Sequence, residues 1–156
     1  MATKKKNSAH SNSGQDIYSL LHQDHERVAK LMQQIEKSPT EKREELFQQL
    51  KMEIEKHSMA EEIIVYPKLK EADTEAINEA LDEHDQVDAM LSELEQISAD
   101  SDEWMDRFTE LKDAVEHHVE EEESEMFKVA REVFSEEQAR ELAEQVKFEK
   151  EQMSPA

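Results

Sequence analysis

Apolar side chains recur every three or four positions along most of this chain, which is the spacing of one buried face of an α-helix. Short polar stretches containing Ser, Thr, Asp or Pro interrupt the pattern, and these residues commonly cap or end helices. The pattern therefore predicts five helical segments separated by connections of a few residues. They span about residues 16–37, 40–70, 74–97, 102–133 and 135 onward.

The helix starts carry recognisable capping residues. Asp16 and Thr74 are the predicted N-caps of the first and third segments, and Ser135 with Gln138 forms a capping box that opens the fifth. Four long amphipathic helices with short connections bury their apolar faces against one another in an up-down-up-down bundle. We therefore predict an all-α fold: a disordered N-terminal tail over 1–14, a four-helix bundle over 15–134, and a short additional C-terminal helix and tail over 135–156.

Composition agrees with this fold and excludes several functions. The 156 residues include one Gly, three Pro and no Cys, so disulfides, thiolate metal sites and thiol catalysis are excluded. The net charge of −21 repels nucleic acid and anionic lipid, so we expect neither as a partner. No apolar run approaches the ~18 residues of a membrane span, and the Lys-rich start lacks the apolar region of a secretory signal. We expect a cytoplasmic protein.

Histidine and glutamate occupy positions in the apolar faces where the spacing requires an apolar side chain. The second and fourth segments each place a His and a Glu there, four positions apart, and the first and third each place one His. The bundle interior thus receives six candidate metal ligands: His25, His57, Glu61, His84, His118 and Glu122.

Such a cluster is costly unless something compensates it. A buried unpaired carboxylate costs several kcal/mol, and a buried imidazole without partners costs ~1–3 kcal/mol. Bound metal ions remove most of this cost, because the imidazoles and carboxylates become ligands to positive charge. A buried His–carboxylate hydrogen bond explains either His–Glu pair taken alone. It is a weaker explanation when all four helices contribute at once.

The sequence around these residues is also repeated. Residues 57–66 align with 118–127 at an offset of 61, and Asp24-His25 aligns with Glu83-His84 at an offset of 59. Two copies of one helix pair predict a pseudo-twofold bundle. A twofold arrangement of ligands suits two metal ions that share bridging carboxylates.

With two His-x3-Glu pairs and a further histidine on each of the other two helices, residues 16–133 resemble the hemerythrin-like, or HHE cation-binding, family. The resemblance implies two iron ions joined by a bridging oxide or hydroxide. It also implies the roles of the ligands, with one iron held by His25 and His57, the other by His84 and His118, and both bridged by Glu61 and Glu122.

Two positions bear on how far the resemblance extends. Asp88 stands where oxygen-carrying hemerythrins have a fifth histidine, which argues against reversible oxygen carriage. Asp88 can be a weak terminal ligand, a hydrogen-bond acceptor or a residue at the rim of the site. A longer spacing known in the family makes Glu123 a rival to Glu122, although the repeat favours Glu122.

The ligand types alone leave iron, manganese and zinc open, and the resemblance favours iron. Our first hypothesis is a di-iron protein that senses, stores or transfers iron, or binds a small ligand such as O2, NO or peroxide. A second is a peroxide- or NO-handling oxidoreductase at the same site, and reversible oxygen binding is a further alternative. A structural module with neutral core histidines is the third hypothesis. The sequence does not identify a protein partner.

Overall fold

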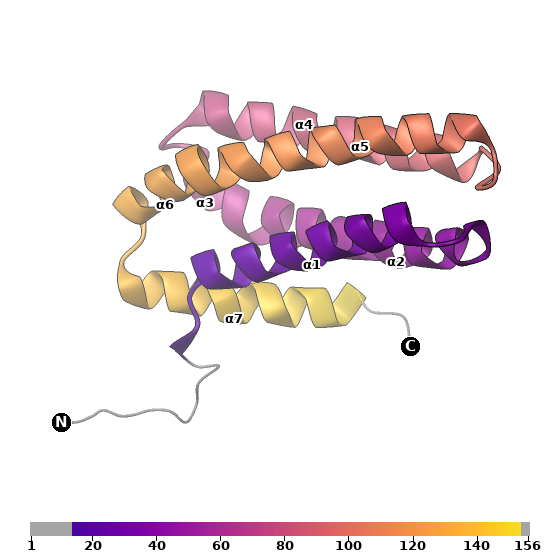
Figure 1. Cartoon of the computed structure of the whole chain (residues 1–156). Coiled ribbons are helices and arrows are strands. Elements are labelled where there is room, and N and C mark those ends of the chain that lie inside the picture. The colour runs from indigo at the N-terminus through magenta and orange to yellow at the C-terminus, as the bar shows by residue number, and fades with distance from the viewer. Residues whose placement is uncertain (1–13, 154–156) are drawn as a thin grey trace.

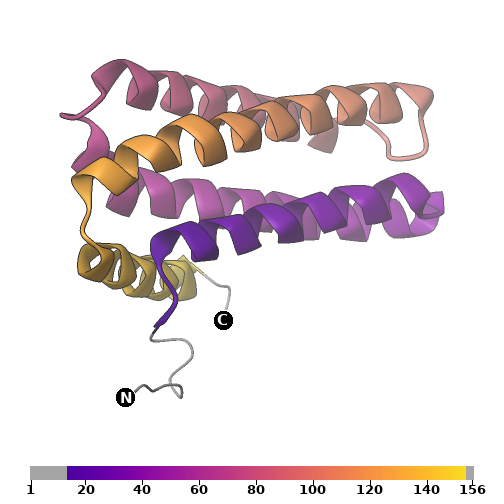
Figure 2. The same ribbon diagram turned by 60° about the vertical axis from the view of Figure 1, so that its left-hand side comes forward.

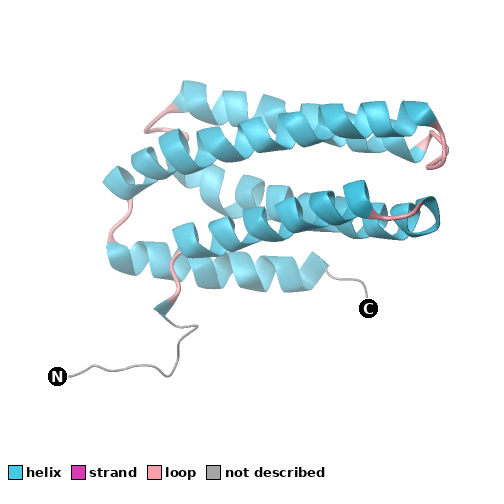
Figure 3. Cartoon of the chain, viewed as in Figure 1, coloured by secondary structure: helices cyan, strands magenta, loops and turns pink. Residues whose placement is uncertain are grey.

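The computed structural model describes residues 14–153, and every regular element in that part of the chain is a helix (Figure 3). Nearly all of the predicted N-terminal tail lies outside the described residues. The main helices are α1 (Ile17–Lys37), α2 (Thr40–Ala60), α4 (Thr74–Glu95), α5 (Asp102–Glu121) and α7 (Glu136–Met153).

Two of the bundle helices contain a π-helical turn. Helix α2 runs through η2 (Glu61–Val65) into α3 (Tyr66–Leu69), and α5 runs through η3 (Glu122–Met126) into α6 (Phe127–Val133). Each π-helical turn begins at one of the two predicted bridging glutamates. Single π-turns inside α-helices are frequent at functional sites, because the extra residue redirects the side chains that follow.

Helices α1, α2, α4 and α5, with the continuations of α2 and α5, form the predicted up-down-up-down bundle. Helices α4 and α5 lie side by side above α1 and α2, and successive helices are joined at alternating ends (Figure 1). The fifth helix, α7, contacts α1, α2 and η2, so it covers the outer face of one helix pair (Figure 2). No helix within residues 14–153 is long and apolar enough to cross a membrane.

The capping predictions hold at two of three helix starts. The Asp16 side chain accepts a hydrogen bond from the Ser19 backbone N–H, and Ser135 and Gln138 cap each other reciprocally. The prediction for the third segment is wrong by one residue: Asp73 is the N-cap, because its carboxylate reaches the Ala76 backbone N–H. The neighbouring Thr74 hydroxyl donates instead to the Lys70 carbonyl.

The apolar core is divided into two clusters. One lies toward α3, α6 and α7 and includes Leu20 and Leu142; the other lies toward the opposite end and includes Leu50 and Phe108. Along α1, Leu21 belongs to the first cluster and Val28 to the second. The predicted polar ligands therefore occupy a layer between two dry regions.

Candidate metal centre

All six predicted ligands lie in this central layer and are buried. Their nitrogen and oxygen atoms form two groups in which every atom lies within 4.8 Å of the others. The first group consists of His25, His57, Glu61 and Glu122, and the second of Glu61, His84 and His118.

Glu61 belongs to both groups because its two oxygens face different histidines. Its Oε2 lies 3.3 Å from His57 Nε2, and its Oε1 lies 3.2 Å from His84 Nε2. The side chain is fully buried. A carboxylate placed in this way presents one oxygen to each half of the site, which is the arrangement of a bridging ligand.

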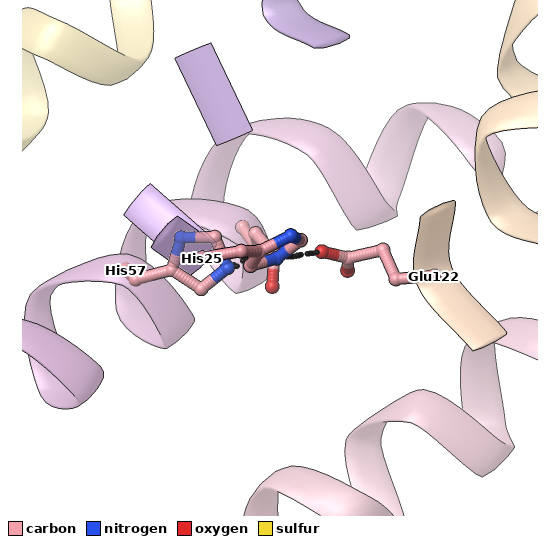
Figure 4. A group of neighbouring side chains, drawn as sticks. His25, His57 and Glu122 are labelled. Carbon is pink, nitrogen blue, oxygen red and sulfur yellow. Dashed lines mark hydrogen bonds and ion pairs between the residues drawn. The ribbon is translucent and has the colours of Figure 1, made fainter. Parts of the chain in front are cut away.

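Glu122 repeats this arrangement from the opposite side. Its Oε1 lies 2.9 Å from His25 Nε2, and its Oε2 lies 3.8 Å from His118 Nε2. Figure 4 shows Glu122 approaching the rings of His25 and His57, which lie next to each other with their centroids 4.9 Å apart. The geometry therefore favours Glu122 over Glu123 as the second shared carboxylate.

A profile of the Hemerythrin HHE cation binding domain family matches residues 16–130. The chain belongs to this family. A crystal structure of an HHE cation binding domain-containing protein from Mycobacterium kansasii has a similar fold, with a TM-score of 0.81 and 30% sequence identity. The similarity covers 88% of this chain and 86% of that one.

A second relative is much longer than this HHE chain. A Nostoc sp. protein named DNA nickase is 31% identical over 140 residues, which is 86% of this chain. The matched region is only 39% of that relative, so the chain spans about two fifths of its length.

In this HHE domain each of the four predicted ligand histidines contacts a carboxylate through its Nδ1 atom. Two of these carboxylates directly follow a shared glutamate: Glu123 Oε2 lies 2.7 Å from His25 Nδ1, and Glu62 Oε2 lies 2.7 Å from His84 Nδ1. Because a carboxylate only accepts hydrogen bonds, each Nδ1 carries a hydrogen, and in a neutral ring Nε2 keeps its lone pair. Glu123 therefore contacts Nδ1 of His25, whereas Glu122 contacts Nε2 of the same ring.

The other two carboxylates directly precede a ligand histidine. Asp24 Oδ2 lies 2.9 Å from His57 Nδ1, and Glu83 Oε1 lies 2.7 Å from His118 Nδ1. The four supports thus obey the same pseudo-twofold relation as the ligands. Sequence reasoning did not assign them these roles, although the doubled acids at Glu61-Glu62 and the acids next to His25 and His84 were visible in the repeat.

The pKa values of two histidines show that the buried layer stabilises positive charge. Burial lowers the pKa of His84, but the hydrogen bond and charge of Glu61 outweigh burial and raise the pKa to about 9. Burial likewise lowers the pKa of His57, while the charge of Glu61 and the bond to Asp24 raise it well above its ordinary value. The layer thus favours positive charge.

Four buried side-chain atoms in the described chain lack a hydrogen-bond partner, and two of them belong to this layer: His57 Nε2 and Glu61 Oε2. Native interiors rarely leave such atoms unpaired. Both atoms face the space between the ligands, so a cation at that position would satisfy them. The donor set therefore fits a metal ion, as the family description implies.

Tyr66 breaks the twofold symmetry of the site. Its hydroxyl donates to Glu122 Oε2 at 2.8 Å and lies 3.1 Å from Glu61 Oε1, so it contacts both shared carboxylates. Burial and the charges of Glu122 and Glu61 raise its pKa well above the ordinary value, so it stays a donor in the ion-free site. The repeat places Phe127 at the equivalent position, where no hydroxyl exists.

The remaining candidates lie outside the layer. Asp88 is exposed and belongs to neither converging group in the described chain. His22 is exposed, and its Nδ1 lies 2.8 Å from Glu123 Oε2. His117 is 63% exposed and contacts Glu121 on the surface.

Proposed function

We propose that this HHE domain binds two iron ions between its four helices, with one ion held by His25 and His57 and the other by His84 and His118. Glu61 and Glu122 would be shared between them. The observation that carries the proposal is the position of Glu61, whose two oxygens lie 3.3 Å and 3.2 Å from histidines of different halves. Iron bound there would supply electron-transfer and small-ligand chemistry that these side chains do not provide alone.

The experiment is metal reconstitution of the purified protein under anaerobic conditions with ferrous iron. We expect about two ions per chain by metal analysis, and after oxidation a visible absorption spectrum that azide changes. His118→Ala should lower both iron content and melting temperature, because ligand binding stabilises the folded state. His117→Ala is the matched control and should leave both near wild type, since His117 faces solvent.

Two results would refute the proposal. A wild-type protein that stays colourless and takes up no transition metal would favour a structural module with neutral histidines. A His118→Ala variant with the full iron load would show that the ligand assignment is wrong.

A small cavity favours a role in handling O2, NO or peroxide. It has a volume of about 30 Å³ and borders all four ligand histidines. A single water needs roughly 10–15 Å³, so the cavity has room for a diatomic molecule. Its other walls are mostly apolar, and they are formed by Val28, Ile54, Ser58, Val87, Val115 and Val119. Such a lining admits a small uncharged ligand next to the ligand nitrogens and limits access of bulk water.

Rapid mixing separates ligand binding from catalysis. The reduced, iron-loaded protein would be mixed separately with O2, NO and hydrogen peroxide. Repeated consumption of peroxide or NO by unchanged protein supports an oxidoreductase, whereas a single stoichiometric spectral change supports sensing or binding. A stable, reversible oxygen complex would contradict the expectation drawn from Asp88.

We do not extend DNA nicking to this chain. The net charge of −21 opposes close approach to a phosphate backbone, and the chain matches only 39% of the Nostoc relative. We propose that the nicking named for that relative depends on regions this chain does not match. A DNA-binding titration at low salt tests this, and measurable affinity would contradict it.

A further inference from the structure

A cleft of about 260 Å³ opens on the outer face of the bundle between α4 and the rod formed by α5, η3 and α6. Among residues 14–153, no Lys or Arg lines this cleft, whereas six carboxylates do so in addition to Glu122. They are Asp73, Glu75, Glu79, Glu83, Glu121 and Glu125.

The floor of the cleft reaches the candidate metal centre. His118 and Glu122 line it, although their side chains are only 10% and 1% exposed. Glu83, which also lines it, holds His118 through one carboxylate oxygen. The cleft therefore joins solvent to two of the six ligands.

On the other half of the bundle, α7 covers the equivalent face. Figures 1 and 2 show α7 against α1 and α2 and no helix in the corresponding place against α4 and α5. Buried side chains of α7, including Leu142 and Val146, share one core cluster with that face. The pseudo-twofold halves thus differ in whether a fifth helix closes them.

The internal repeat shows that the two halves also differ in the residues that line the cleft. At the offsets of 59 and 61, three acids of the cleft align with apolar residues of the covered half. These pairs are Glu79 with Leu20, Glu121 with Ala60, and Glu125 with Ile64. These three pairs place acids on the face of one half that corresponds to the apolar face covered by α7 in the other half.

The histidine supports differ in the same direction. Asp24, in the covered half, is buried and bonded by Lys150 of α7 at 2.6 Å and by Arg27 at 2.7 Å. Its counterpart Glu83 instead turns its second oxygen toward His117 Nε2, at 3.7 Å. Cations of the protein therefore fill the approach to one half, while the approach to the other half is left acidic.

We propose that this cleft is the route by which divalent metal ions reach the buried centre. The inference rests on the proposed metal function. A cleft with walls of one charge sign concentrates counterions and raises their association rate. Two of the wall carboxylates, Glu83 and Glu121, belong with the neighbouring His117 to a group whose ligand-type atoms lie within 4.8 Å of one another.

The test measures the rate of metal uptake, using Co²⁺ because it absorbs in the visible range. The double variant Glu79→Gln/Glu125→Gln removes two wall charges and touches none of the six ligands or their four supports. Its matched control is Glu44→Gln/Glu45→Gln, which removes the same charge from exposed positions of α2. Stopped-flow mixing of the ion-free proteins with Co²⁺ would be run at ionic strengths of about 0.01 M and 1 M.

We expect uptake by the cleft variant to be slower than wild type by about tenfold at low salt, and to approach the wild-type rate at high salt. The control should match wild type, and all three proteins should reach the same final Co²⁺ content. Helical content and melting curves verify that the variants fold.

The outcomes separate the two proposals. A cleft variant that loads as fast as wild type at low salt overturns the route and leaves the metal function standing. An equal slowing in the control also overturns the route, because the effect would come from total charge. A wild-type protein that binds no Co²⁺ and no iron overturns the metal function, and the route with it.

Discussion

Lys150 lies 2.6 Å from Asp24, and this contact connects the last helix to the candidate metal centre. The other oxygen of Asp24 accepts the Nδ1 hydrogen of His57. Burial raises the pKa of Asp24, but the bond and charge of His57, together with Lys150, lower it well below its usual range. Helix α7 lies beyond residues 16–130, which match the family, yet it contributes to the support of one ligand.

The first prediction concerns this contact. Lys150→Met keeps an unbranched side chain one atom shorter but removes a cation from the buried Asp24, which contacts His57. Loss of a hydrogen-bond partner behind a ligand typically weakens metal binding about 10- to 100-fold. Lys150 acts on His57 through Asp24, so we expect the lower end of this range. Metal affinity should fall about tenfold, as measured by a competition titration with a chelator.

Lys147→Met is the control on the same helix. Lys147 forms a surface ion pair with Glu144 at 3.7 Å, and such pairs contribute little. Its affinity should equal that of wild type. Equal metal affinities in the two variants would show that α7 packs against the bundle without affecting metal binding.

The second prediction separates the two adjacent glutamates of η3. Glu122→Gln removes a carboxylate that faces both halves, so we expect metal content to fall by about half or more even at saturating metal. Glu123→Gln replaces the charged acceptor at His25 Nδ1 with a neutral amide oxygen, so full content should remain while affinity falls about tenfold, the lower end for loss of such a partner. Metal analysis after equilibrium dialysis measures both. The reverse result would make Glu123 the shared ligand.

The pattern of the sequence was sufficient to predict the helices and the six converging side chains. Apolar periodicity defines the inward face of each helix, and a His or Glu within that face has only the interior to enter. The repeat then paired His25 with His84 and His57 with His118, and the structure brings all four to one layer. These predictions depend only on spacing along a regular helix.

The supports were beyond such reasoning because they depend on packing between helices. Glu123 and Glu62 lie one position after an inward residue, which on a helix turns a side chain about 100° away from the axis. The π-helical turns that begin at Glu61 and Glu122 alter that direction, and the spacing of apolar residues does not predict these turns. Likewise, nothing in the pattern of α7 identifies Lys150 as the partner of Asp24.

The third prediction tests the asymmetric hydroxyl. Tyr66→Phe removes a donor to the buried Glu122 and Glu61, and hydrogen bonds to charged groups contribute about 1.5–3 kcal/mol. We expect the ion-free protein to lose about that free energy of unfolding. The metal-loaded protein should lose less, because bound cations then neutralise the same carboxylates.

Tyr18→Phe provides the matched comparison. The Tyr18 hydroxyl is buried, and within the described chain it has no hydrogen-bond partner, so its removal should cost almost nothing. Denaturant unfolding of both variants, with and without metal, measures the difference. Equal losses for the two tyrosines would refute a specific role for Tyr66.

The last prediction concerns pH in the ion-free protein. Folding raises the pKa of His84 from 6.5 to about 9, despite burial, because Glu61 and its neighbours favour the charged ring. A raised pKa stabilises the fold fully below pH 6.5, and that contribution disappears as pH rises through about 9. The free energy of unfolding, measured in the presence of a chelator, should therefore fall between pH 6.5 and 9 by an amount on the order of a few kcal/mol.

With metal bound, Nε2 of His84 no longer takes up the proton. The free energy of unfolding should then stay constant over the same pH interval, or should rise because metal competes better with protons at higher pH. Ion-free His84→Gln should lose much of the slope that wild type shows. An ion-free wild type that becomes more stable between pH 6.5 and 9 would contradict the charge balance inferred for the layer.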